Sequence, residues 1–358
     1  MDRHANAPDR DGTDISGDPP LAGVTAVVGG RYEIKFGERL NHLDSPQANA
    51  FGVRDLEGGS RQRFALVLKH NSYGRFSQFD KFAAIDAGAM LRAFAFAAVG
   101  VPGADVERMA LIMERPAGVR IMTRDSKPED KLDERAVIDR ILSPAEDSLR
   151  ALHRLDLTHR AIRPDNLYCR DRAEGPVGLG ECLSAPPGFD QPDAFEPIES
   201  AMASPTGRGD GSAASDMFAL GVTIVTLLSG RWPARQHQPQ RIMRRIERGS
   251  YREYAGAVRC SNDMEDLLAG LLYDDPEGRW NVDQLRAWLN KKSVGRRLFY
   301  RAKSGHRPFR VEGLSCATPR AVAYAMSLHR DAARVMIATG QLTHWLERSL
   351  GEIRMADA

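Results

Sequence analysis

The spacing of apolar residues changes near Gly118, and this change constrains the fold more than any other feature. Before it, stretches such as YEIKF, AFGVRD and RFALVLKH are rich in β-branched and aromatic residues and are separated by turn residues, which is typical of antiparallel strands. After it, apolar residues alternate steps of four and three and so share one helical face: Ile138, Leu142, Ala145, Leu149 and Leu152. The sequence therefore predicts an α+β fold of two lobes, a small one that is mainly sheet and a larger one that is mainly helix.

Individual elements follow from the same patterns. Residues 77–99 are predicted to form one helix, since their apolar side chains are spaced as on one helix face: Phe82, Ile85, Ala89 and Phe96. A strand, ERMALIMERP, follows this helix. In the second lobe the sequence SPAE predicts that the long helix either restarts there or kinks at Pro144, and a kink is favoured. Residues 217–228, apolar nearly all round, are expected to form a buried central helix.

Composition narrows the class of protein without pointing to a ligand. The 358 residues are 42% hydrophobic and 27% charged, near the average of globular proteins, which excludes a wholly disordered or coiled-coil chain. The net charge is only +2, so no specific nucleic acid is expected as a partner. The four cysteines form no CxxC pair, so neither a zinc site nor a disulfide framework is indicated, and a cytoplasmic location is expected.

Residues 1–30 are small, polar and proline-rich, and they predict a disordered tail without a secretory signal. No apolar stretch of the chain reaches the roughly 18–20 residues that cross a bilayer, so no transmembrane segment is expected. The remaining predicted boundaries are 31–116 for the first lobe, 117–290 for the second, 291–310 for a basic linker and 311–358 for a C-terminal helical module.

The basic linker holds eight Lys or Arg and no acid. It is a candidate contact for an acidic surface, although such runs are most often solvated. After it, PFRVEG predicts a short strand, and two amphipathic helices are predicted over residues 318–340 and 342–350. Two short helices bury little surface alone, so they are expected to dock on the second lobe, on each other with the PFRVEG strand, or on a partner.

One string carries most of the chemical information: LHRLDLTHRAIRPDNLYCR. It resembles the catalytic loop of the eukaryotic-like (Hanks-type) Ser/Thr protein kinases, in which HRD is followed after four residues by Asn. His159, Arg160 and Asn166 match this pattern, but Ala161 stands where the family has the aspartate that accepts the substrate hydroxyl proton. Asp165 is no substitute, since it is adjacent to Asn166 and would require the loop to be remodelled.

Further motifs in the same order extend the resemblance over most of the chain. RFALVLK is similar to the strand that carries the nucleotide lysine, here Lys69, and LIMERPAG to the hinge of the nucleotide pocket, with Met113 and Glu114. SDMFALG resembles the central helix, whose Asp216 would hold the catalytic-loop backbone, and DPEGRW the last family motif, with Arg279. The chain is identified as a degenerate, bacterial member of this family, a pseudokinase with the two-lobed kinase fold.

The departures from the family gather where phosphoryl transfer needs particular groups. The stretch that corresponds to the glycine-rich phosphate loop contains only Gly52. The metal-binding motif aligns with Glu181, Cys182 and Leu183, so a longer carboxylate replaces the metal aspartate. Asn166 and Glu181 are therefore candidate metal ligands, with a solvated loop carboxylate as the alternative for Glu181.

Two ion pairs of the family also lack their usual acids. The helix glutamate that pairs with the nucleotide lysine is absent, so Asp80 or Asp86 would have to pair with Lys69. The motif that supplies the acidic partner of Arg279 aligns with the sequence SPT at residues 204–206, which contains no acid. His159 and Arg160 are expected to be structural, the first packed and the second paired with the activation segment.

Three functions follow from the resemblance. The first is a pseudokinase that acts as a scaffold or switch through protein contacts, with no certain cofactor and with ATP, with or without Mg²⁺, as the candidate ligand. The second is a divergent kinase or another phosphoryl or nucleotidyl transferase that uses Lys69, Asn166 and Glu181. The third is an adaptor whose C-terminal module binds the partner. Loss of the general base costs roughly a hundred- to ten-thousand-fold in rate, which favours the first.

Overall fold

A computed structural model describes residues 23–59, 62–85, 88–170, 175–233, 239–292, 294–295 and 303–356. The described residues divide into two compact units. The first unit takes its residues from Met1–Asp86, Leu91–Ala117 and Glu181–Pro186, and the second from Ala87–Met90, Gly118–Gly180 and Pro187–Ala358. Asp86, one of the two predicted partners of Lys69, lies outside the described residues.

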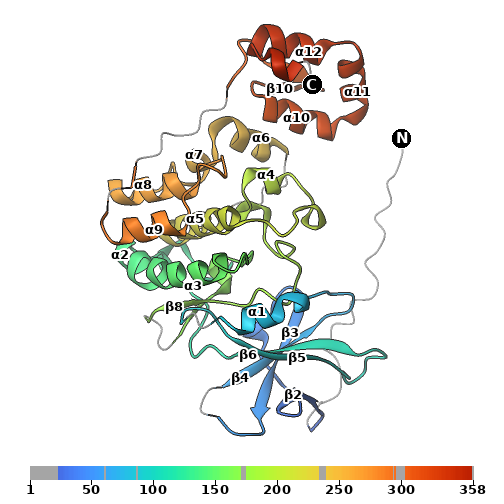
Figure 1. Cartoon of the computed structure of the whole chain (residues 1–358), viewed down its shortest axis with the longest axis vertical. Coiled ribbons are helices and arrows are strands. Elements are labelled where there is room, and N and C mark those ends of the chain that lie inside the picture. Colours follow the sequence, from blue (N-terminus) through green and yellow to red (C-terminus); the bar gives the residue numbers. More distant parts are fainter. Residues whose placement is uncertain are drawn as a thin grey trace. The chain divides into compact units, whose positions relative to one another are not determined.

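The first unit is built on one antiparallel sheet of six strands in the order β1-β2-β3-β4-β6-β5 (Figure 1). Alternate residues of β2, Tyr32, Ile34 and Phe36, are buried because they face an apolar cluster on one side of the sheet. The six strands are β1 (Thr25–Val28), β2 (Tyr32–Arg39), β3 (Ala48–Asp55), β4 (Arg63–Leu68), β5 (Ala93–Val99) and β6 (Arg108–Glu114).

The prediction of one helix over residues 77–99 is wrong. Among the described residues of this range, Phe79–Ala83 forms an α-helix, α1, after a 3-10 turn at Phe76–Gln78, and Ala93–Val99 is strand β5, which pairs with β6. The sequence of β5, AFAFAAV, alternates large and small residues at a period of two, and Phe96 stacks on Phe76 with ring centroids 4.9 Å apart. Pairing in the sheet therefore prevails over the helix-like spacing.

The predicted disordered tail, residues 1–30, also extends too far at its C-terminal end. Thr25–Val28 pairs antiparallel with β2, Val28 facing Tyr32, and forms strand β1. The turn at Gly29 and Gly30, both with positive φ, reverses the chain between the two strands. The composition of the tail concealed this strand because only TAVV within it is rich in β-formers.

The second unit is mainly helical, with α5 (Ala213–Ser229) buried along most of its length, as its apolar sequence predicts. Gly230, in the left-handed conformation, ends α5. Figure 1 shows α3, α8 and α9 around it. The other elements before the C-terminal module are α2 (Glu134–Val137), α3 (Ser143–His153), β7 (Leu167–Cys169), β8 (Val177–Leu179), α4 (Ile198–Ala201), α6 (Pro239–Arg248), α7 (Ser250–Tyr254), α8 (Asn262–Leu271) and α9 (Val282–Leu289).

The long helix passes through Pro144 without restarting. One π-helical turn, Ile138–Leu142, joins α2 to α3, and the backbone of Leu142 and Ser143 stays helical. Proline has no N–H to donate to the preceding turn, and a wider turn accommodates that loss. The disturbance predicted at Pro144 is thus a local widening on its N-terminal side.

The C-terminal module, residues 303–356, packs on α4 and α6 within the second unit. One apolar cluster contains Ile198 of α4, Ile242 and Ile246 of α6, and buried module residues such as Val311 and Trp345. The module's elements are β9 (Phe309–Val311), β10 (Leu314–Cys316), α10 (Pro319–Leu328), α11 (Arg330–Ala338), α12 (Gln341–Trp345), a π-helical turn (Leu346–Leu350) and α13 (Ile353–Ala356). Of the three docking alternatives, the structure shows two together: the module packs on the lobe, and its helices share the same cluster with strand β9.

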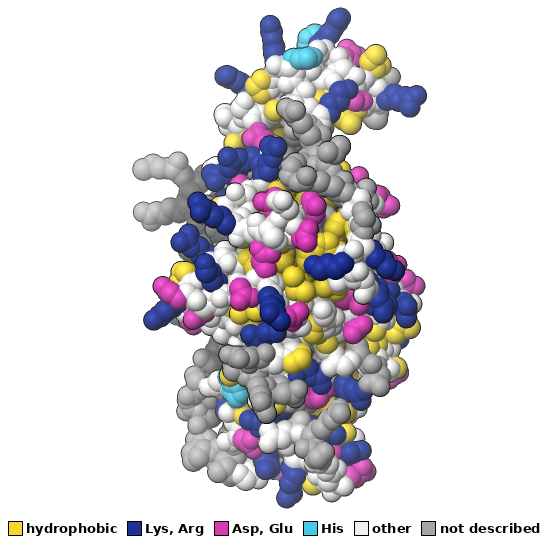
Figure 2. Space-filling view, turned by 90° about the vertical axis from the view of Figure 1, so that its left-hand side faces the viewer, with side chains coloured by type: hydrophobic (Ala, Val, Ile, Leu, Met, Phe, Trp, Pro, Cys, Tyr) yellow, Lys and Arg dark blue, Asp and Glu magenta, His cyan; other side chains and the backbone are white. Residues whose placement is uncertain are grey.

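The single helix predicted over residues 318–340 is divided at His329, whose ψ of 64° leaves the helical region. Leu328, the last residue of α10, is 42% exposed. Over the described part of the chain, no helix has the length and apolar character needed to cross a membrane. On the face drawn in Figure 2, acidic and basic side chains are interspersed, in line with the small net charge.

Candidate functional site

Asp216, on the first turn of α5, anchors the segment that resembles a catalytic loop. Its Oδ2 accepts the N–H of His159 and its Oδ1 the N–H of Arg160, both at 2.8 Å, and Nε2 of His153 lies 3.1 Å from Oδ2. Burial by itself would raise the pKa of Asp216, but the hydrogen bond from His153 and the nearby charges outweigh it and lower that pKa. Asp216 therefore stands where it was predicted to hold the loop backbone.

Arg160 is buried in an ion pair. Its φ of 59° is left-handed, and its Nη2 lies 3.0 Å from Oε2 of Glu196. A Cβ at Gly188 or Gly211, both left-handed, would fall within 2.4 or 2.5 Å of the Arg160 side chain. Burial raises the pKa of Glu196, although the nearby charges of Arg160 and Arg208 act to lower it. The guanidinium thus pairs with the segment that follows residue 187, in keeping with its predicted structural role.

Ala161 and Asn166 are joined through the backbone. The Asn166 amide donates to the Ala161 carbonyl at 2.9 Å, and the N–H of Gly180 donates to the Asn166 carbonyl at 2.8 Å. The Ala161 methyl group can neither accept nor release a proton. Asp165 pairs with Arg163 at 2.8 Å, so it is directed to its own loop. Within this unit the loop therefore has the backbone hydrogen bonds expected of a kinase-like loop, but an alanine occupies the position of the catalytic base.

Lys69, in the first unit, is exposed just beyond the end of β4. Its Nζ donates to the carbonyl of Pro46 at 3.0 Å, and no carboxylate of the described residues forms an ion pair with it. Met113 is buried in β6, and Glu114 bonds through its N–H to the Arg92 carbonyl at 2.8 Å. The predicted lysine therefore ties down the β2–β3 loop in this structure, and Asp80 is not its partner.

Glu181 caps its own loop. Its Oε2 accepts the N–H groups of Leu183 and Ser184, both at 2.9 Å, and its Oε1 accepts the Ser184 hydroxyl at 2.5 Å. Ser184 has a single hydroxyl proton and gives it to Glu181, so Ser45 is the donor in the 2.9 Å bond between the two serines. Ser45 lies in the β2–β3 loop, which takes the place of the glycine-rich loop.

These contacts do not fit a bound Mg²⁺. Three hydrogen bonds occupy three of the roughly four lone-pair positions of the Glu181 carboxylate, which leaves at most one for an ion that requires near-octahedral geometry. At Gly52, the one glycine of the corresponding stretch, an added Cβ would lie 2.2 Å from Cδ of Glu38, so a carboxylate covers this position. Among the described residues, no group of three or more His, Cys, Asp or Glu side chains has a metal-binding arrangement.

Arg279 has an acidic partner, so the prediction that this ion pair lacks its acid is wrong. Its Nη2 lies 3.4 Å from Oε1 of Glu199 on α4, and its other nitrogens donate to the carbonyls of Tyr273 and Ala214. Burial lowers the pKa of Arg279, opposed mainly by Glu199. The sequence did contain an indication of this acid: Glu199 follows Pro197 after one residue, whereas the family motif has Pro and Glu adjacent.

Comparison with known proteins gives the same fold and relatives. No family model matches the chain. It is 31% identical over 201 residues to serine/threonine-protein kinase H1 homolog of Danio rerio, covering 50% of this chain and 43% of that protein. It is 28% identical over 157 residues to serine/threonine-protein kinase STK11 of Homo sapiens, covering 41% of this chain and 35% of that one. The matches thus span about two fifths of these relatives.

Among solved structures, the crystal structure of Rad53 1-466 in complex with AMP-PNP superposes with a TM-score of 0.55 at 17% identity. The match covers 73% of this chain and 66% of that one. The sheet unit, the helical unit and the Asp216-anchored loop agree with this likeness. The chain is accordingly similar in sequence to serine/threonine protein kinases over about half of its length and has the α+β kinase fold.

Proposed function

We propose that this chain is a pseudokinase of the bacterial, eukaryotic-like branch, located in the cytoplasm, that acts as a non-catalytic scaffold or switch through protein contacts. The observation that carries the proposal is Ala161 within an otherwise complete loop. Asp216, His159 and Arg160 hold the backbone as a kinase-like loop requires, while the residue that should accept the substrate proton is a methyl group.

The hydrogen-bonded chain Ser45–Ser184–Glu181 supports the same function. It joins the loop that stands for the phosphate cradle to the carboxylate that stands for the metal ligand. Ser184 is fully buried, so opening this contact would expose or unpair buried polar groups, at about 1–3 kcal/mol for each. Phosphates and Mg²⁺ would both have to displace it.

A nucleotide is the one ligand that the relatives suggest. Since the Rad53 structure contains AMP-PNP, adenine binding at the hinge strand that ends in Met113 and Glu114 is the corresponding expectation. We expect ATP to bind weakly or not at all, and without dependence on Mg²⁺. Calorimetric titration with ATP, with and without Mg²⁺, measures this. Tight, Mg²⁺-dependent binding that is lost in Glu181→Ala would contradict it.

The function itself is tested by phosphoryl transfer from radiolabelled ATP to generic protein substrates. The wild-type chain should give no signal above that of Lys69→Ala. Ala161→Asp, which restores the missing carboxylate, should remain inactive because the metal and phosphate positions are also altered. Robust transfer by the wild type, abolished by Lys69→Ala, would instead support the divergent transferase that uses Lys69, Asn166 and Glu181.

A further inference from the structure

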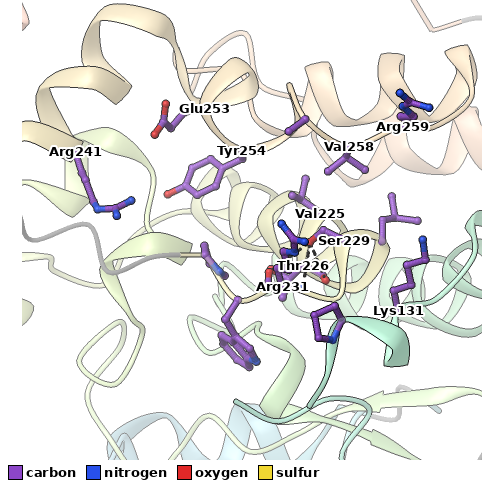
Figure 3. A pocket seen from close by; sticks show the side chains of 15 residues that line it. Lys131, Val225, Thr226, Ser229, Arg231, Arg241, Glu253, Tyr254, Val258 and Arg259 are labelled. Atoms are coloured by element: carbon purple, nitrogen blue, oxygen red, sulfur yellow. Dashed lines mark hydrogen bonds between the residues drawn. The ribbon is translucent and has the colours of Figure 1, made fainter. Parts of the chain in front are cut away.

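A cavity of about 600 Å³ lies in the second unit, at the C-terminal end of α5. Its volume is within the range of about 300–1,000 Å³ that is usual for ligand sites. No residue of the kinase-like loop lines it, and none of the family motifs named above explains it. Its lining comes from α5 and the turn after it, from α6, from α7 and residues 257–259 that follow it, and from the turn before α2 (Figure 3).

The lining carries four cationic side chains and one acid. The cations are Lys131, Arg231, Arg241 and Arg259, and the acid is Glu253. Glu253 is already shared with Arg244 and Arg248, which approach its two oxygens to 3.9 and 3.7 Å from outside the cavity. The charge that the cavity offers a ligand is therefore positive.

Three of the cations are exposed: Lys131, Arg231 and Arg259. Their side chains form no ion pair with any residue that the structure describes. An exposed cation is well solvated, so a single one would contribute little to the binding of an anion. Several lining one cavity raise the local concentration of anions and speed their encounter.

Apolar side chains lie between the cations, and two aromatic ones are held by hydrogen bonds. Val225 and Val258 contribute aliphatic surface, and Trp232 is held by its indole N–H, which donates to the Thr123 carbonyl at 2.7 Å. The Tyr254 hydroxyl donates to the Ala194 carbonyl at 2.7 Å, and burial raises the pKa of Tyr254 to about 12, so this wall stays uncharged at physiological pH. The cavity can thus receive an apolar side chain between charged groups.

The cations are spread along the cavity and do not converge. In Figure 3, Arg241 lies at one end, Arg231 near the middle beside Thr226, and Lys131 and Arg259 at the other end. A single phosphate or carboxylate could contact only one end. We propose that this cavity binds an acidic segment of a partner protein, with carboxylates on the cations and an apolar side chain against Val225 and Trp232. This inference rests on the proposed scaffold function and names the chemistry of the partner.

The test uses the full chain and a fluorescein-labelled peptide of glutamates with leucine at every third position, followed by anisotropy. Matched peptides replace glutamate by glutamine or leucine by serine. The protein variants are Arg231→Glu with Arg259→Glu, and the milder Arg231→Ala with Arg259→Ala. Arg334→Glu with Arg348→Glu, on the exposed side of the C-terminal module, makes the same charge change elsewhere. Thermal unfolding confirms that each variant is folded.

We expect the glutamate peptide to bind and to weaken as salt is added, while the glutamine peptide does not bind and the serine peptide binds more weakly. Charge reversal at the cavity should weaken binding by at least about tenfold, the alanine pair by less, and the control pair by under about twofold. Equal losses in the cavity and control variants would show non-specific attraction and overturn the site.

Two further outcomes would also overturn the proposal. One is no binding of the glutamate peptide to the wild type at low salt. The other is equally tight, cavity-dependent binding of inorganic tripolyphosphate, which would identify a site for small anions. None of these results depends on phosphoryl transfer, so failure of this site leaves the pseudokinase proposal standing, and detection of kinase activity leaves the site standing.

Discussion

The catalytic-loop region and the phosphate-side region of this molecule have departed from the kinase pattern in different ways. Around Asp216 the hydrogen bonds that shape the loop are complete, and only the base is replaced, by Ala161. Around Glu181 the polar groups are present but bond to one another through Ser184 and Ser45. Groups that hold a buried backbone cannot be removed without loss of stability, whereas a side chain that supports no buried contact can be exchanged without unfolding the protein.

The largest effect on stability is expected in the catalytic-loop region, where Asp216 holds the loop backbone. Asp216→Ala should lower the free energy of unfolding of the second unit by about 3–5 kcal/mol, because it leaves the N–H groups of His159 and Arg160 buried without an acceptor. Urea unfolding measures the change. Asp210→Ala, at an exposed position nearby in sequence, should change it by less than about 0.5 kcal/mol. If both variants unfold with a similar free energy, Asp216 does not support the loop, and the contrast between the two regions fails.

Removal of Arg160 comes next in size. Arg160→Ala leaves the buried Glu196 without its nearest cation, with Arg208 4.0 Å away, and should cost about 2–4 kcal/mol. Adding Glu196→Gln should recover part of this loss, since the remaining side chain is then neutral. A double-mutant cycle in urea measures the coupling. If the losses are additive, the pair does not act as a unit.

The pH dependence of stability distinguishes the two buried carboxylates. The pKa of Asp216 is lowered by folding, so its contribution is present above its unfolded pKa and is lost as the pH falls through the lower, folded value. The pKa of Glu196 is raised, so the folded state loses stability as the pH rises from the unfolded value through the raised one. Asp216→Asn should flatten the stability profile on the acid side, and Glu196→Gln should flatten the fall at higher pH. Unfolding curves across the acid range measure both, and unchanged slopes would contradict them.

The smallest effect is expected on the phosphate side. Ser184→Ala removes two side-chain hydrogen bonds and should destabilise the first unit by about 1–2 kcal/mol, while Ser72→Ala, which removes one half-exposed bond to Gln47, should cost about half of that. If the contact also excludes nucleotide, Ser184→Ala should bind ATP more tightly than the wild type in the calorimetric titration. Weaker binding would show that Ser184 supports the nucleotide site and does not close it.

The parts that were predictable are those in which neighbouring residues act together. The loop from His159 to Asn166 could be recognised because its spacing is local, and α5 because it is apolar nearly all round. Strand β5 was missed because its residues suit both a helix face and a strand, and the choice is made by β6. Glu199 was missed because one extra residue separates it from Pro197.

The sequence by itself determined the division into a sheet lobe and a helical lobe, the alanine at position 161 and the anchoring of the loop by Asp216, since each depends on residue types at short or family-specific spacings. Only the tertiary structure decided that Ser45 meets Ser184, 139 residues away, that Glu199 pairs with Arg279, and that four cations line one cavity. Contacts between distant segments depend on how the chain is packed, because burial and hydrogen bonding then set which polar groups find partners.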